Sequence, residues 1–270
     1  MFKKYALIIK NPIAGKIKNR DSKIHTLINI LSKHLFSYKT CVTGKKGDAV
    51  EFIKCYAKDA DIIVCCGGDG TLHEIVNGLI NENLQTPIYY FPTGTTNDMA
   101  RTLCLSNNKK PAADLLLNGL INDQDAGVFN GNICLTYSAS FGAFTDISYN
   151  TPQWIKNRLG YCAYWIYGFK SLSSIKPYQA IITTDNQTFE GRFIFGCVSN
   201  STSIGGILKL ADQKVDLCDG RMELLLIRYP KSPAELGQLI FDVARGKYSN
   251  KNIIFTQAER ISVRFQNDVD

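Results

Sequence analysis

The first half of the chain alternates short apolar runs with segments of helical spacing, and no other feature constrains the fold as strongly. The apolar runs have the length of buried strands, and the segments between them carry apolar residues every three or four positions. The predicted strands are Tyr5–Ile9, Tyr38–Val42, Asp61–Cys66 and Pro87–Phe91, and the predicted helices are Asp21–Leu35, Asp48–Ala57, Leu72–Ile80 and Thr96–Leu103. This alternation predicts a Rossmann-like α/β domain over residues 1–130, with a parallel sheet between two layers of helices.

From about residue 131 onwards, strands follow one another with few helices between them. The expected strands are Ile133–Phe141, Gln179–Thr184, Thr188–Ser199, Met222–Ile227, Ile253–Phe255 and Ile261–Phe265. Helices are expected only near Trp154–Leu172 and Pro233–Ala244. We therefore predict a mainly antiparallel β-sandwich domain over 131–270, with a binding site in the cleft between the two domains.

The composition argues against several classes of protein. Nine cysteines without a CxxC pair indicate a reducing compartment rather than a disulfide framework, so we expect a cytoplasmic protein. The net charge of +7 comes without any block of like charges, which argues against a nucleic-acid partner. No apolar stretch approaches the length of a transmembrane helix.

A glycine-rich loop follows the predicted strand Asp61–Cys66 directly, with the sequence Gly67-Gly68-Asp69-Gly70-Thr71. Consecutive glycines allow positive φ and let backbone N–H groups approach an anion, and a following helix N-terminus adds partial positive charge. Thr71 and Glu74 have the T-x-x-E spacing of a capping box, which predicts a helix start there. A tight turn without a ligand explains this loop equally well, because it matches neither a Walker A loop nor a Rossmann fingerprint.

Two more loops of similar chemistry follow other predicted strands. One contains Asn11, Pro12 and Gly15, and the other contains Gly94, Thr95, Asn97 and Asp98. Because parallel strands end at the same edge of their sheet, the three loops are expected to converge there. Each loop alone has a structural explanation, but their coincidence favours a phosphate site.

Together these segments resemble the catalytic domain of the diacylglycerol kinases, which are lipid kinases related to sphingosine kinases and NAD kinases. The first-half motifs are Asn11-Pro12-x-x-Gly15, Gly67-Gly68-Asp69-Gly70-Thr71 and Pro92-x-Gly94-Thr95-x-Asn97-Asp98-x-Ala100-Arg101. The third motif is the most specific to lipid kinases. The likeness continues with Asp125-x-Gly127, Arg158-Leu159-Gly160-Tyr161-x-Ala163-Tyr164 and Asp216-x-x-Asp219-Gly220, and so covers most of the chain.

The resemblance implies a diacylglycerol kinase-like fold that transfers the γ-phosphoryl group of ATP to a lipid hydroxyl, most often that of diacylglycerol, giving phosphatidic acid. The nucleotide-binding positions that it implies are Asn11, Pro12, Gly15, Thr43, Gly67, Gly68, Asp69, Gly70, Thr71, Gly94, Thr95 and Asn97. The chain departs from the family at Ala14, where Ser is frequent, and at His73, where Asn is frequent. We assign His73 no catalytic role.

Three aspartates are candidate catalytic groups. Asp69 and Asp98 follow glycine-containing turns and suit Mg²⁺ binding through water or orientation of the acceptor, although Asp98 is equally explained as a helix cap. The third candidate, Asp125, rests on the resemblance, which implies that it links a structural Mg²⁺ to the ATP site.

The position of that Mg²⁺ is also implied by the resemblance. The ion would be held by Asp219 and by the carbonyl groups of Asp216 and Arg221. Carboxylates and carbonyls at a turn are ligands that Mg²⁺ prefers. From the spacing alone, an ordinary Asp-Gly turn at Asp219-Gly220 is the simpler explanation.

The sequence says less about how the lipid binds and about which group removes the proton from its hydroxyl. Aromatic and basic residues between 154 and 170 suit either a membrane surface or packing on the β domain. The resemblance implies a lipid substrate met by peripheral association with a membrane, and it favours a homodimer. The family's general base lies in an Asp-Gly-Glu segment, which we expect beyond Asp270. The alternatives are an NAD kinase-type enzyme and a nucleotide- or lipid-binding protein that lacks the base.

Overall fold

The computed structural model describes residues 4–15, 20–34, 36–106, 109–131, 133–142, 177–204, 208–209, 215–244, 247–248 and 250–266. The chain divides into two compact units, Met1–Thr136 and Tyr137–Asp270. In the described part, no helix is long and apolar enough to cross a membrane.

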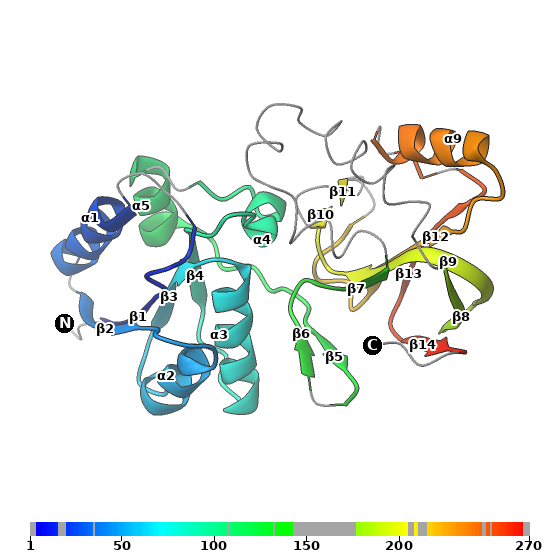
Figure 1. Cartoon of the computed structure of the whole chain (residues 1–270). Helices are drawn as coiled ribbons and strands as arrows, with labels where there is room; N and C mark the ends of the chain where they lie inside the picture. The colour runs from blue at the N-terminus through cyan, green and yellow to red at the C-terminus, as the bar shows by residue number, and fades with distance from the viewer. Residues whose placement is uncertain are drawn as a thin grey trace. The chain divides into compact units, whose positions relative to one another are not determined.

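The first unit is built on a parallel sheet with the strand order β2-β1-β3-β4 (Figure 1). Its strands are β1 (Lys4–Lys10), β2 (Phe36–Val42), β3 (Ile62–Gly67) and β4 (Ile88–Pro92). The register pairs Lys10 with both Val42 and Cys66, and Gly67 with Pro92. All four strands therefore end at one edge, and the predicted parallel sheet is confirmed.

Helices cover both faces of this sheet (Figure 1). On one face lie α1 (Arg20–Lys33) and α5 (Lys109–Asn118), and on the other lie α2 (Asp48–Tyr56) and α3 (Asp69–Asn81). The buried side chains of α1 pack against alternate residues of the strands, including Ile8, Val64 and Phe91. The short helix α4 (Asp98–Thr102) follows β4. Helix α5 was not predicted.

The second unit contains an antiparallel sheet with the order β13-β12-β9-β8-β14, in which β7 also pairs with β9. The strands are β7 (Ser138–Gly142), β8 (Tyr178–Thr184), β9 (Thr188–Ser199), β12 (Met222–Arg228), β13 (Ile253–Ala258) and β14 (Ile261–Phe265). A two-residue pair, β10 (Ser203–Ile204) and β11 (Leu208–Lys209), forms a separate ribbon. The predicted antiparallel fold is confirmed, and the described residues build it as one six-stranded sheet.

Strand β12 is the centre of this unit because both of its faces are buried. Leu225 and Ile227 pack with Leu239 of helix α9 (Pro233–Ala244), whereas Leu224 and Leu226 pack into a second apolar cluster. This explains why the sequence M-E-L-L-L-I does not alternate between apolar and polar residues. The predicted helix over 154–172 and the motif at 158–164 lie outside the described residues.

The predicted strand Ile133–Phe141 is in fact two strands that belong to different units. Strand β6 (Ile133–Leu135) pairs with β5 (Gly127–Phe129) and contacts α3, whereas β7 joins the antiparallel sheet. The first unit thus runs to Thr136 rather than ending at our boundary of residue 130. Buried Cys134 and Thr136 hold this hairpin within the first unit.

The predicted capping box at Thr71 and Glu74 is wrong. Helix α3 begins at Asp69 after an extended Gly68, so Thr71 lies inside the first turn instead of at the cap. The carboxylate of Glu74 instead accepts hydrogen bonds from the backbone N–H groups of Gly47 (3.0 Å) and Ala49 (3.3 Å). Glu74 therefore caps the neighbouring helix α2, and the contact fastens α2 to α3.

We predict that Glu74→Ala lowers the free energy of unfolding by about 1–2 kcal/mol, because it leaves two N–H groups at the start of α2 without their acceptor. Urea denaturation measures this change. The matched control is Glu82→Ala, which alters the exposed residue that follows α3 and should leave stability within about 0.5 kcal/mol of the parent protein. Equal effects of the two substitutions would contradict the cap.

Candidate functional site

The strand order of the first unit creates a natural ligand edge. The chain passes from β1 to β2 on one side, and then crosses over to β3 on the other side of β1. Ligands of open α/β sheets bind at the carboxyl ends of the strands where the order reverses in this way. The loops Asn11–Gly15 and Gly67–Thr71 follow β1 and β3 at that position.

Three loops touch at this edge, as predicted. The backbone N–H of Asn11 donates to the carbonyl of Cys66 (2.9 Å), and that of Thr93 donates to the carbonyl of Gly67 (2.7 Å). A Cβ atom added to Gly94 would lie only 2.6 Å from the Cα of Gly68, so the two backbones meet without room for a side chain. A third glycine, Gly15, has φ +63°, and its Cβ would lie 2.2 Å from the carbonyl oxygen of Thr93.

Gly67 and Gly68 of the central loop are needed because they leave space and not because they adopt positive φ. Gly68 is extended, with φ −101° and ψ −172°, and Gly67 does not have a positive φ either. A Cβ at Gly67 would lie 2.5 Å from the side chain of Thr71. Our expectation of positive φ in this loop was wrong. The side chain of Thr71 excludes a Cβ at Gly67, and the backbone of Gly94 restricts one at Gly68. Gly70, in contrast, has open space around it.

Side chains of the predicted nucleotide positions also join the loops. The Asn11 amide donates to the Thr71 hydroxyl (3.1 Å), and its carbonyl oxygen accepts from the N–H of Ile13 (3.1 Å). Thr43 is buried at the end of β2, where its N–H donates to the carbonyl of Lys10 (2.9 Å). The structure thus brings these predicted positions to one edge, and the remaining members Pro12, Gly70 and Thr95 lie in the same loops.

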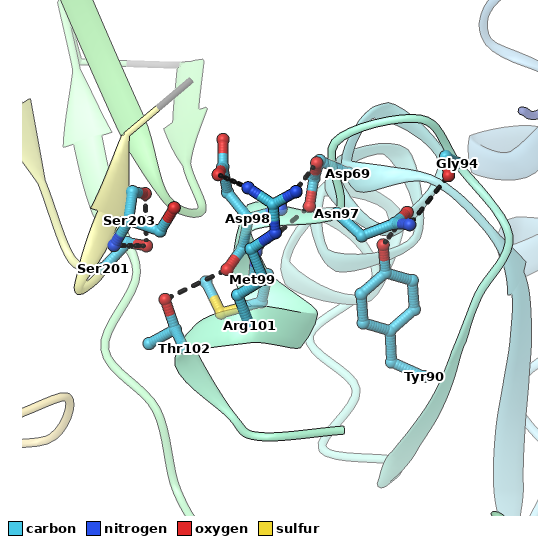
Figure 2. A network of polar contacts seen from close by, with 10 residues as sticks. All are labelled: Asp69, Tyr90, Gly94, Asn97, Asp98, Met99, Arg101, Thr102, Ser201 and Ser203. Atoms are coloured by element: carbon cyan, nitrogen blue, oxygen red, sulfur yellow. Dashed lines mark hydrogen bonds and ion pairs between the residues drawn. The ribbon is translucent and has the colours of Figure 1, made fainter. Parts of the chain in front are cut away.

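Asp69 fixes the third loop to the second. Its carboxylate accepts the backbone N–H groups of Asp98 (3.0 Å) and Met99 (3.2 Å), and so caps helix α4 from 29 residues away (Figure 2). Asn97 has φ +51°, and its side chain bridges the carbonyl of Gly94 (2.7 Å) and the hydroxyl of Tyr90 (3.3 Å). We had considered capping for Asp98, but the structure gives that role to Asp69.

Asp98 itself is almost fully buried, at 1% exposure, and its carboxylate lies 3.9 Å from the guanidinium of Arg101 (Figure 2). A buried carboxylate needs such a partner because desolvation disfavours its charge. The catalytic roles of Asp69 and Asp98 stay predictions.

His73 lies on α3 just after the central loop. Its imidazole is hydrogen-bonded to the hydroxyl of Thr136 (3.1 Å) and to the amide of Asn77 (3.2 Å). Burial lowers the pKa of His73, which keeps the ring neutral at near-neutral pH, although the nearby Glu74 opposes this shift. The contact fastens α3 to the last residue of the first unit.

The predicted cation ligands form a turn in the second unit. The carboxylate of Asp216 accepts the N–H of Cys218 (3.1 Å), and that of Asp219 accepts the N–H of Arg221 (2.9 Å). Gly220 has φ +76°, which an L residue rarely adopts. The side chains of the turn thus shape its own backbone, as an Asp-Gly turn requires.

Two residues near this turn were missed by sequence reasoning. The Asn200 amide, at the end of β9, donates to the carbonyl of Leu217 (3.1 Å) and so holds the turn against the sheet. Glu223, on β12, is 1% exposed, and one carboxylate oxygen accepts from Gln257 (3.2 Å). A single charged residue inside the apolar run of β12 was the signal that could have revealed Glu223.

The electrostatics of this region suit a cation. Burial raises the pKa of Glu223 to about 7, and the negative charges of Asp219 and Asp216 add to the effect. The second carboxylate oxygen of Glu223 is buried and has no hydrogen-bond partner. Over the described ranges, no three His, Cys, Asp or Glu side chains converge, so an ion on this turn would depend on carbonyls and water as well as carboxylate.

Asp125 lies between α5 and β5 in the first unit, whereas Asp216 and Asp219 lie in the second. Its predicted link between the cation and the nucleotide stays a prediction.

Comparison with known proteins decides the family. The sequence profile described as "Diacylglycerol kinase catalytic domain" matches residues 5–129. A diacylglycerol kinase of Bacillus subtilis (strain 168) is 33% identical over 266 residues, which cover 96% of this chain and 86% of the relative. The chain belongs to the diacylglycerol kinase family.

Other relatives agree. A diacylglycerol kinase of Staphylococcus haemolyticus is 32% identical over 264 residues, covering 97% of this chain and 78% of that protein. The crystal structure of a diacylglycerol kinase from Bacillus anthracis has the same fold, with a TM-score of 0.73 at 23% identity over 98% of this chain and 87% of the other. Our recognition of the family is confirmed, and this member of the diacylglycerol kinase family is a lipid kinase.

We predict that Gly94→Ala destabilises the protein by about 1–3 kcal/mol, because the added methyl group forces the Gly68 and Gly94 loops apart. The control is Gly70→Ala in the central loop, where an added Cβ meets nothing within 4 Å. Because Gly70 lies in helix α3, alanine there should be neutral or stabilising by up to about 1 kcal/mol. Urea denaturation of the two variants in parallel measures the difference, and equal stabilities would refute the loop contact.

Proposed function

We propose that this family member uses ATP and Mg²⁺ to phosphorylate the hydroxyl of a lipid, and that diacylglycerol, giving phosphatidic acid, is the substrate. The observation that carries the proposal is the meeting of three loops at the carboxyl edge of the parallel sheet, with Gly68 and Gly94 in backbone contact. Around this contact, backbone N–H groups at the start of α3 are available to an anion, as at other helix N-terminal phosphate sites.

Different residues of this edge have different roles in the proposed binding of ATP. Asn11 and Thr71 hold two loops together through their side chains, and Asp69 holds the third through the backbone of α4. The rigid arrangement places N–H groups before the phosphates arrive, so little reorganisation accompanies binding. Thr95, which is exposed in the third loop, is free of such packing and supplies a hydroxyl to the nucleotide.

Mg²⁺ fits the Asp216–Arg221 turn by the chemistry of its donors. Asp219 would supply a carboxylate oxygen, and Asp216 and Arg221 would supply carbonyl oxygens, which are the hard ligands that this ion prefers. When bound, the ion neutralises negative charge and holds the turn in one conformation. The buried, unpaired oxygen of Glu223 beside two aspartates indicates that this part of the second unit favours a nearby positive charge.

The lipid arrives from a membrane surface in this proposal, so the protein would associate with membranes peripherally. The names of the relatives support diacylglycerol as the acceptor. A homodimer is part of the same proposal by family resemblance, and nothing in it requires a nucleic-acid partner.

The activity is tested with radiolabelled ATP, Mg²⁺ and a panel of acceptors in mixed micelles. We expect label to appear in phosphatidic acid when diacylglycerol is present, and less label with ceramide, a sphingoid base or a polyprenol. NAD in the same assay should stay unlabelled. If diacylglycerol is not labelled while another acceptor is, the substrate assignment is wrong, and if none is labelled the proposed activity is wrong.

We predict that Gly68→Val abolishes ATP binding. An added Cβ would lie 3.1 Å from the Cα of Gly94, and two further methyl groups would fill the space in which the backbone meets phosphate. Isothermal calorimetry measures ATP affinity, and a thermal melt establishes that the variant is folded. Glu190→Gln, which neutralises an exposed residue on β9 of the other unit, serves as the control and should bind ATP within a few-fold of the parent protein. Unchanged ATP affinity in folded Gly68→Val would refute the assignment of this loop.

A further inference from the structure

A polar row interrupts one face of the antiparallel sheet. On this face of β12, Ile227 and Leu225 pack into the apolar cluster beneath α9, and the next residue on the same side is Glu223. The register pairs Glu223 with Ser199 of β9 on one side and with Gln257 of β13 on the other. Paired residues of antiparallel strands share a face, so Ser199, Glu223 and Gln257 lie side by side.

Two atoms of this row are buried without a hydrogen-bond partner. Ser199 is 0% exposed and Glu223 is 1% exposed, and both the Ser199 hydroxyl and one carboxylate oxygen of Glu223 are unsatisfied. Buried polar groups in folded proteins nearly always have partners, and an unsatisfied carboxylate is especially costly. Two neighbouring unsatisfied groups indicate that a further polar species belongs between or above them.

The Asp216–Arg221 turn lies at the end of the sheet where β12 begins, next to Glu223. Val215 packs against the apolar cluster of the same face, and Asn200, which follows Ser199 directly, holds the carbonyl of Leu217. The turn leads directly into β12, so Asp219 precedes Glu223 by only four residues along the chain. No described trio of such side chains is close enough to ligate one ion directly.

We propose that Ser199 and Glu223 are positioning residues that bind the water shell of a divalent cation held on the Asp216–Arg221 turn. Mg²⁺ usually keeps several of its waters, and these waters donate hydrogen bonds to oxygen acceptors around the ion. Water bound to the ion would satisfy both buried groups and place the Glu223 charge near the cation. The inference rests on the proposed function only in its choice of Mg²⁺, and it extends the site inward from the turn to the centre of the sheet.

The test compares Mg²⁺-induced stabilisation in the intact chain and in single variants, using thermal melts over a series of MgCl₂ concentrations. Glu223→Gln keeps the size of the side chain and removes its charge, and Ser199→Ala removes only the hydroxyl. Asp219→Ala removes the ligand on the turn. The matched control is Glu190→Gln, which neutralises an exposed glutamate on β9.

We expect Glu223→Gln to weaken the apparent Mg²⁺ affinity about 10–100-fold, which is the usual effect of losing an outer-shell partner. Without Mg²⁺ the same variant should melt no lower than the parent protein, because it loses an unsatisfied buried charge. A residue with a merely structural role would shift both melts equally. Ser199→Ala should weaken the Mg²⁺ response in the same direction, Asp219→Ala should abolish it, and Glu190→Gln should not change it.

Two results would overturn the proposal. In the first, Glu223→Gln and Ser199→Ala respond to Mg²⁺ as the parent does, so the polar row does not touch the ion's water. In the second, the parent itself shows no Mg²⁺ response, so the turn holds no cation. Failure of the proposed function looks different, because lipid phosphorylation would then be absent while the Mg²⁺ responses of parent and variants still differed as expected.

Discussion

The contact between the backbones of Gly68 and Gly94 is the constraint on which the ligand edge of the first unit depends. Only two residues without side chains can approach this closely, since an added Cβ on either would lie about 3 Å or less from the other's Cα. Once they meet, Asp69 is brought against the start of α4 and caps it, and Gly15 completes the group from the first loop. Each loop therefore holds its neighbours in place, and removing one contact loosens the others.

Regular elements could be predicted from the sequence because their signal is local. Strands β9 and β14 and helix α9 begin and end where the apolar pattern places them. The strands of the first half could also be predicted, since buried parallel strands form continuous apolar runs between helices. Helix α5 was not predicted, and β6 was joined to β7 because their apolar patterns run together across Thr136.

The errors at the site share a physical cause, which is that long-range contacts choose among locally reasonable alternatives. Thr71 and Glu74 have capping-box spacing, but the hydroxyl of Thr71 is engaged by Asn11 and the carboxylate of Glu74 by α2. Asp69 caps a helix that starts 29 residues later. The row of Ser199 and Glu223 likewise depends on strand register, which no single strand sequence reveals.

In the proposed function, the two units would supply different parts of what phosphoryl transfer requires. Under the proposal, the backbone N–H groups at the glycine edge of the first unit would bind phosphate. The carboxylates of Asp216, Asp219 and Glu223 in the second unit would favour the cation that balances the phosphate charge. The chain passes from one unit to the other after Thr136. His73, on the helix that follows the central glycine loop, is hydrogen-bonded to the hydroxyl of Thr136. Because burial keeps this imidazole neutral, the link does not depend on pairing with a charged group, and it holds the start of the connection to the helix that follows the central glycine loop.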